Sequence, residues 1–113
     1  MDSVVTRGLV ASGKGCEGVV RRVGQVADVF ALLQEPDLGD MILLTESATA
    51  TAVVPLLDKV CGLICTSGGI TSHLAIVSRE FGLPCIMAAE VADPAELDGT
   101  WVIMAEDGTV RRA

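Results

Sequence analysis

The chain contains few of the residues that commonly do chemistry or mark a membrane protein. Its 113 residues include one histidine, one tryptophan, two phenylalanines and no tyrosine. No apolar run approaches the roughly 20 residues that a membrane-spanning helix needs. The first residues also lack the basic and apolar regions of a signal peptide. We therefore expect a cytoplasmic protein with no membrane partner.

The cysteines are few and show no metal-binding spacing. None of the four, Cys16, Cys61, Cys65 and Cys85, forms a Cys-x-x-Cys pair. With one histidine in the chain, a dedicated zinc site is not expected, and we predict that no metal is bound by this domain. Most of these thiols lie in apolar runs, where cysteine behaves as a small hydrophobic residue, so we interpret them as structural.

Positive charge is also scarce, since the net charge is -7 and the basic clusters are only the pairs Arg21-Arg22 and Arg111-Arg112. This balance argues against nucleic acid as a partner. What the chain has in abundance is aliphatic side chains, with 50% hydrophobic residues and 3% aromatics. A chain of this length buries about 65% of its unfolded surface, so we expect residues 1–113 to form a single domain.

The pattern along the chain predicts an α/β fold of short strands with two main helices. Strands are predicted at 4–11 (broken at Arg7-Gly8), 18–23, 41–45, 61–65 and 85–88, and a hairpin joins 101–105 to 109–111. Helices are predicted near 52–59, with Pro55 in the first turn, and over the segment that follows the histidine, with a further short helix over 26–34 and a turn over 93–97. The first two strands suggest a hairpin or a corner.

Three spaced glycines between those first strands, Gly13, Gly15 and Gly18, formally match the dinucleotide-binding pattern. That pattern requires a helix after the glycines, whereas the residues that follow are strand-like. We therefore interpret 13–18 as a glycine-rich turn, and we treat Lys14 as a surface lysine.

The most informative stretch runs from Gly68 to Pro84 and contains His73, the only histidine. Apolar residues recur at helical spacing after His73, Thr71 or Ser72 can cap the helix, and Gly82 can end it. Gly68 and Gly69 allow the backbone that enters the helix to approach a ligand closely. His73 is thus expected in the first turn of a helix, beyond the carboxyl end of a strand, where α/β sheets bind ligands.

This placement suits phosphoryl transfer. The positive end of a helix disfavours the imidazolium, so His73 is expected to be a neutral ring that can attack phosphorus. The helix amides and the hydroxyls of Thr71 and Ser72 would then stabilise the phosphoryl oxygens. Simpler roles stay open for these residues: helix capping alone for Thr71 and Ser72, and a tight turn alone for Gly68-Gly69. Arg79 and Glu80 are expected on a solvated helix face or in an ion pair with another strand.

The stretch Gly-Gly-Ile-Thr-Ser-His-Leu-Ala-Ile-Val-Ser-Arg-Glu-Phe-Gly-Leu-Pro, residues 68–84, resembles the signature of the mobile phosphohistidine domain of phosphoenolpyruvate-utilising enzymes. The histidine after Thr-Ser is the phosphorylated residue of that family, and it matches His73. The resemblance implies a compact, swivelling β/β/α sandwich with the active histidine at a helix N-terminus. The family's Ala-Ser-Pro-Gly turn is matched only in part, by Ala11-Ser12 and then Gly13-Lys14.

The resemblance further implies a phosphoryl carrier, inactive alone, that forms one component of a multi-domain or split phosphotransferase. Mg²⁺ and ATP, or phosphoenolpyruvate, are expected on an ATP-grasp-like partner domain and an acceptor-binding domain, with no cofactor on this one. An alternative is the same scaffold as an unphosphorylated lid or assembly subunit of a two-component enzyme. A serine hydrolase centred on Ser67 is disfavoured, because Cys65 stands where the nucleophile elbow needs glycine.

Overall fold

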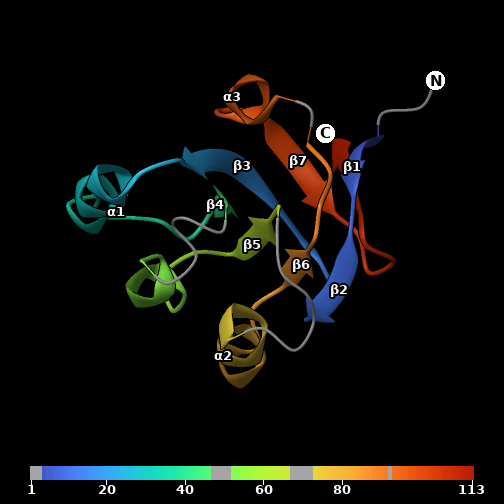
Figure 1. The fold of residues 1–113 in the computed structure, drawn as a ribbon, viewed down its shortest axis with the longest axis horizontal. Helices are drawn as coiled ribbons and strands as arrows, with labels where there is room; N and C mark the ends of the chain where they lie inside the picture. The colour runs from blue at the N-terminus through green and yellow to red at the C-terminus, as the bar shows by residue number, and fades with distance from the viewer. Residues whose placement is uncertain (1–3, 47–51, 67–72, 92) are drawn as a thin grey trace.

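The computed structural model describes residues 4–46, 52–66, 73–91 and 93–113, and Figure 1 shows their arrangement. The elements in chain order are β1 (Val4–Arg7), β2 (Leu9–Ser12), β3 (Cys16–Val23), α1 (Val26–Leu33), β4 (Met41–Thr45), the 3₁₀ turn η1 (Val54–Leu56), β5 (Gly62–Cys65), α2 (His73–Phe81), β6 (Cys85–Met87), α3 (Pro94–Leu97), β7 (Trp101–Met104) and β8 (Thr109–Arg112). None of the described helices is long and apolar enough to cross a membrane.

The eight strands form one sheet in the order β1-β8-β7-β3-β4-β5-β6-β2. The central strands β3, β4, β5 and β6 are parallel, and the remaining pairings are antiparallel. All residues of β4 and β5 are buried, as expected for parallel strands that are covered on both faces. Both of these strands were predicted from their continuous apolar runs.

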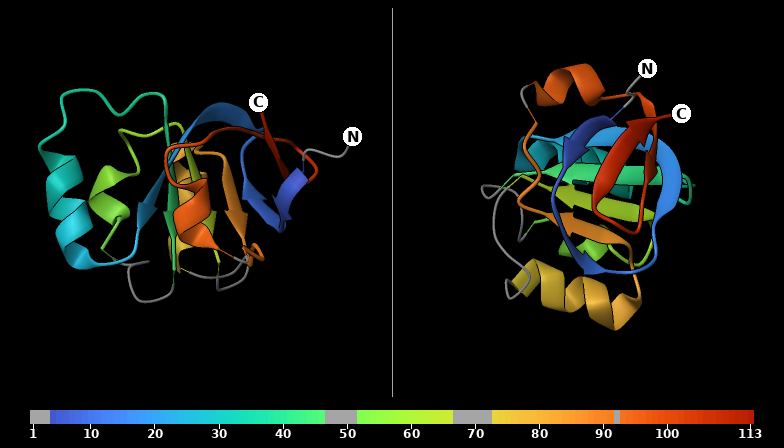
Figure 2. Two further views of the ribbon diagram at one scale, coloured as in Figure 1. Left: turned by 90° about the horizontal axis from the view of Figure 1, so that it is seen from above. Right: turned by 90° about the vertical axis from the view of Figure 1, so that its right-hand side faces the viewer.

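Side chains that alternate along β4 and β5 enter two separate cores. Leu43 and Leu63 pack under α1, η1 and α2, whereas Ile42 and Ile64 face the antiparallel strands and α3. Figures 1 and 2 show α1, η1 and α2 on one side of the parallel strands, and β1, β7 and β8 on the other. The fold is therefore the predicted mixed α/β sandwich of two β layers and one helical layer.

The two outermost strands of the sheet, β1 and β2, are consecutive in the chain and meet at Gly8. The Gly8 amide donates to the carbonyl of Gly108. A Cβ at Gly8 would lie 2.5 Å from the carbonyl oxygen of Met87. Only glycine, which has no Cβ, lets the backbone pass this close to the main chain at both Gly108 and Met87.

Of the two arrangements predicted for the first two apolar runs, a hairpin or a corner, the hairpin is excluded, because β2 pairs with β6 whereas β3 pairs with β4 and β7. The chain turns a corner instead at Gly13 and Gly15, which both have positive φ, of 78° and 98°. Strand β3 follows this turn directly. The observed strand agrees with the glycine-turn interpretation and not with a dinucleotide site.

Two helical predictions need correction. The segment near 52–59 is not an α-helix, because only Val54–Leu56 is helical, as a 3₁₀ turn with Pro55 at its start. The apolar side chains of Val53, Leu56 and Leu57 are nevertheless buried in the core between this segment and the sheet. The expected turn over 93–97 is a one-turn helix, α3, in which the Asp93 carboxylate accepts from the Ala95 amide. The two long helices are thus α1 and α2.

Candidate functional site

The carboxyl edge of the parallel strands positions the candidate site. Two hydrogen bonds hold this edge together: the Thr66 amide donates to the carbonyl of Thr45, and the Ala89 amide donates to the carbonyl of Cys65. The chain leaves β5 at Cys65 and re-enters the described structure at His73, the first residue of α2. A strand that leads to a helix N-terminus at this edge is the usual place for a ligand in α/β sheets.

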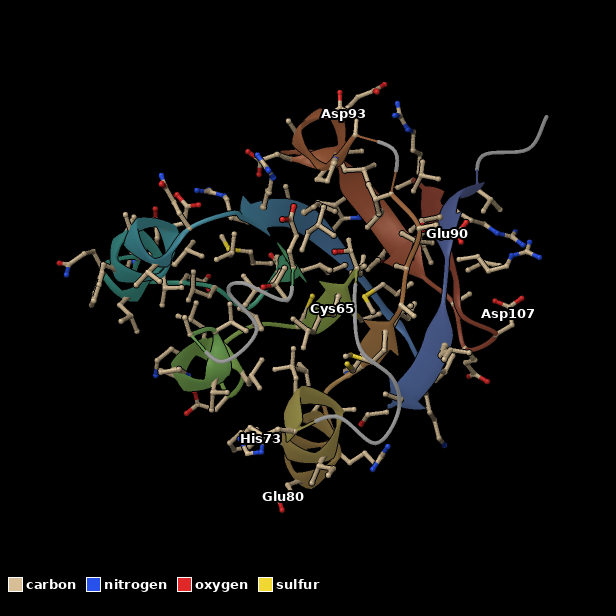
Figure 3. All side chains as sticks on the ribbon, viewed as in Figure 1. Cys65, His73, Glu80, Glu90, Asp93 and Asp107 are labelled. Atoms are coloured by element: carbon tan, nitrogen blue, oxygen red, sulfur yellow. The ribbon has the colours of Figure 1, made fainter. Side chains whose placement is uncertain are left out.

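His73 begins α2, as the sequence predicts, and its side chain is exposed. Figure 3 shows the ring projecting outward from α2, not into the core beneath the helix. Ile76, three residues on, is also 43% exposed, and Glu80, seven residues on, is exposed too. These spacings place all three on one helix face, which is open to a partner molecule.

The opposite face of α2 fixes the orientation of that helix. Leu74, Ala75 and Ser78 are buried against the sheet, and the Ser78 hydroxyl donates to the Leu74 carbonyl at 2.8 Å. Gly82, with φ of 66°, ends the helix. The buried side chains hold the helix on the sheet, so the position of His73 does not depend on contacts of its own ring.

Arg79 ties α2 to the sheet edge, because its Nε donates to the Ala11 carbonyl of β2 at 2.8 Å. The sequence predicted a solvated helix face or an ion pair with another strand. Arg79 does contact another strand, β2, but through a main-chain carbonyl and not through an ion pair. Arg79 lies in the last turn of α2, so this hydrogen bond helps to position the helix on the sheet.

The first turn of α2, His73 to Ile76, contains no acidic residue. The positive end of the helix dipole therefore has no carboxylate in its first turn to oppose an incoming anion. The other predicted site residues, Gly68, Gly69, Thr71 and Ser72, lie outside the described residues, as does Ser67 of the hydrolase alternative. Their roles stay predictions.

Sequence reasoning missed the shape of the chain after β6. Ala88 has a positive φ of 54°, the only described residue other than glycine that does. This left-handed turn leads into a shallow hollow of about 560 Å³ lined by Thr66, Ala89, Glu90 and Val91. Alanine carries no sequence signal for a left-handed conformation, so the turn was not predictable.

The sequence assigns no catalytic role to two residues near the early turn, Ser12 and Lys14. Ser12 is half-buried at the end of β2, and Lys14 is exposed in the turn before β3. Among the residues that the structure describes, no group of three or more histidine, cysteine, aspartate or glutamate side chains could hold a metal ion.

Comparison with known sequences defines the class of protein. Residues 38–108, more than half of the chain, match the sequence profile of the PEP-utilising enzyme mobile domain. The chain therefore belongs to the family of mobile domains of phosphoenolpyruvate-utilising enzymes, as its motif around His73 predicts.

Individual relatives are much longer enzymes. The chain is 32% identical over 107 residues to phosphoenolpyruvate synthase of Pyrococcus furiosus, which covers 94% of this chain and 12% of that enzyme. Over 84 residues, or 74% of the chain, it is 38% identical to pyruvate kinase of Staphylococcus epidermidis, covering 14% of that enzyme. Over the same length it is 32% identical to a probable phosphoenolpyruvate synthase of Methanothermobacter thermautotrophicus, covering 11%.

Solved structures share the fold. The N-terminal domain of Enzyme 1 - Nitrogen superposes with a TM-score of 0.56 and 26% identity, over 77% of this chain and 37% of that one. A UPF0107 protein superposes with a TM-score of 0.62 over 96% of this chain and 99% of that one, at 13% identity. The second likeness concerns the fold alone, and it extends over a whole chain of similar size.

Proposed function

We propose that the protein is a phosphoryl carrier in which His73 is transiently phosphorylated. The observation that carries this proposal is the position of His73, exposed in the first residue of α2 within the family motif. A lone pair of the neutral ring attacks the phosphorus of a donor, and the bond from phosphorus to the donor's leaving oxygen breaks. We assign the attack to Nε2, the nitrogen farther from the backbone, by analogy with the family.

The helix then stabilises the product of that step. The phosphoryl group on His73 brings negative charge to the amino end of α2, where the helix dipole is positive. Thr71 and Ser72 would add hydroxyl donors, and Gly68 and Gly69 would allow close approach of main-chain amides. The same group leaves when an acceptor attacks phosphorus, so one side chain serves both halves of the transfer.

The donor and the acceptor would be held by other domains or subunits. Support for this comes from size, because the chain covers only 11% to 14% of the length of the relatives named above. We propose that Mg²⁺ and ATP, or phosphoenolpyruvate, bind to an ATP-grasp-like partner, and that a second partner binds the acceptor. The carrier would swivel between them in the cytoplasm and would not turn over alone.

Radiolabelling tests this proposal. The chain is incubated with its cognate nucleotide-binding partner and β- or γ-labelled ATP, and separately with labelled phosphoenolpyruvate and the cognate partner for that donor. We expect label on the chain that is lost in acid and kept in alkali, at the peptide that contains His73. Absence of label with every donor would instead support the unphosphorylated lid or assembly subunit.

A further inference from the structure

Two cysteines that are distant in the sequence meet near the amino end of β5. The Cys16 sulfur lies where a side chain at Gly62 would be, 2.7 Å from the position of a Cβ there. The Cys61 sulfur lies 2.9 Å from the position of a Cβ at Gly18. Each glycine is therefore close in sequence to one cysteine and makes room for the sulfur of the other.

The surroundings of this Cys16–Cys61 pair are polarisable and partly open to solvent. Both side chains are half-buried. The Cys16 sulfur lies 3.8 Å from the sulfur of Met104, and the Cys61 thiol donates to the carbonyl of Glu17 at 3.5 Å. Small oxidants can reach such a pair, whereas a fully buried thiol is inert.

The two thiols of the pair differ in acidity. The interaction between the two side chains is the largest cause of both shifts, because it lowers the pKa of Cys61 and raises the pKa of Cys16. Burial and the nearby Asp40 carboxylate each act to raise the pKa of Cys61 and so oppose part of this lowering. Because the thiolate is the nucleophile in thiol chemistry, Cys61 is the side chain that attacks first.

The remaining cysteines provide an internal comparison. Cys65 and Cys85 are each only 1% exposed, beneath the helical layer. Burial is the main reason that the pKa of Cys85 rises to about 11. Cys85 is therefore expected to stay protonated, and burial makes both thiols inaccessible to oxidants in the folded protein.

From this geometry we propose that Cys16 and Cys61 are an oxidative modification site that forms an intramolecular disulfide with hydrogen peroxide. The Cys61 thiolate attacks one peroxide oxygen, the O–O bond breaks, and Cys61 becomes a sulfenic acid as hydroxide takes up a proton and leaves as water. Cys16 then attacks that sulfur, so that an S–S bond forms, the S–O bond breaks and a second water leaves. Two thiols lose two electrons and two protons, and one peroxide is reduced to two waters.

The disulfide would join the start of β3 to the residue before β5, across the start of β4, which lies between these strands in the sheet. His73 follows the carboxyl end of β5, at the opposite edge. The modification therefore fastens three strands together without covering the face of α2 that carries His73. It stands independently of the proposed carrier function.

Peptide mapping tests the disulfide. The whole chain is treated with hydrogen peroxide, its free thiols are alkylated, and it is digested with trypsin without reduction. Cleavage at Lys and Arg places Cys16 in the peptide 15–21, but it leaves Cys61 and Cys65 together in the peptide 60–79. We expect these peptides to be linked, both in the unaltered chain and in the Cys65→Ala/Cys85→Ala variant, and to be unlinked in Cys61→Ser.

Persistence of the link in Cys61→Ser would overturn the assignment, as would oxidation that yields only disulfides between chains. A second pair of variants tests the order of attack with dimedone, which traps sulfenic acids. Cys16→Ser should accumulate dimedone adduct on Cys61, because no thiol remains to resolve the sulfenic acid. Cys61→Ser should give little adduct on Cys16, and equal trapping in the two variants would contradict the proposed roles.

Discussion

Helices α1 and α2 cover the same face of the sheet and follow the carboxyl ends of parallel strands, yet their first turns are built differently (Figures 1 and 2). At α1 the Asp28 carboxylate accepts from the amides of Gly24 at 3.0 Å and Gln25 at 3.1 Å. The first turn of α2 has an imidazole and no carboxylate. The amino end of α1 is thus capped by a carboxylate of its own first turn, whereas the amino end of α2 is able to bind an anion from another molecule.

The two helices also end differently. Helix α1 stops at Gln34, which keeps a right-handed backbone with φ of -85°. Helix α2 stops at Gly82 in a left-handed conformation, and the next amide, that of Leu83, donates back to the Ser78 carbonyl at 2.9 Å. A firmly terminated helix whose first turn lacks an acid is suited to presenting His73, while α1 serves the core.

The largest expected effect comes from His73→Ala. We expect this variant to take up no label from any phosphoryl donor, because the nucleophile is gone. Its free energy of unfolding should change by less than about 0.5 kcal/mol, since the ring is exposed. Urea unfolding beside the labelling assay checks both points, and a loss of several kcal/mol would show that the histidine is a structural residue.

Gly82→Ala should cost the most stability. Nothing lies within 4 Å of a Cβ built at Gly82, so the penalty comes from forcing alanine into the left-handed region, about 1–2 kcal/mol. The matched control is Gln34→Ala at the end of α1, where the right-handed backbone suits alanine and we expect almost no change. Equal effects at the two helix ends would contradict the comparison.

Asp28→Ala should remove the built-in anion of α1 and destabilise the fold by about 1 kcal/mol, the usual value of a helix cap. Chemical denaturation measures this change. Labelling at His73 should be unaffected, because Asp28 belongs to the other helix. If phosphorylation fell with Asp28→Ala at temperatures where the fold is intact, the two helix ends would not be independent.

Ile76→Glu should make α2 resemble α1, by placing a carboxylate three residues from His73 on the same face. Such side chains are about 6 Å apart, and the repulsion of a phosphoryl group in water is about 0.7 kcal/mol per charge. For the one to two charges of the phosphoryl group, we expect labelling to slow by about three- to tenfold at low salt and to recover as salt is added. Ile76→Gln is the neutral control, and an equal loss in that variant would point to steric disruption of partner docking.

Local sequence signals were enough for the elements that matter most here. The buried runs of β4 and β5, the start of α2 at His73 and its stop at Gly82 all follow from short-range patterns of apolar residues, caps and glycine. The α-helix predicted around Pro55 is wrong. The apolar spacing there fits a helix, but a single 3₁₀ turn is enough to bury the same side chains.

Long-range features could not be derived from the sequence. The pairing of β1 with β8 joins the two ends of the chain, and the hydrogen bond from Arg79 to the Ala11 carbonyl links residues far apart in sequence. The meeting of Cys16 with Cys61 depends on glycines in two different strands. Such contacts are fixed by how the sheet closes, which no local pattern encodes.

The meeting of β1 and β2 at Gly8 has a consequence for the two edges of the sheet. Exposed sheet margins invite neighbouring chains to add strands and so promote aggregation. Here one continuous N-terminal segment borders both margins and links them covalently. In the proposed carrier role, this arrangement would let the domain dock with one partner, detach and dock with the next without its sheet pairing to either of them.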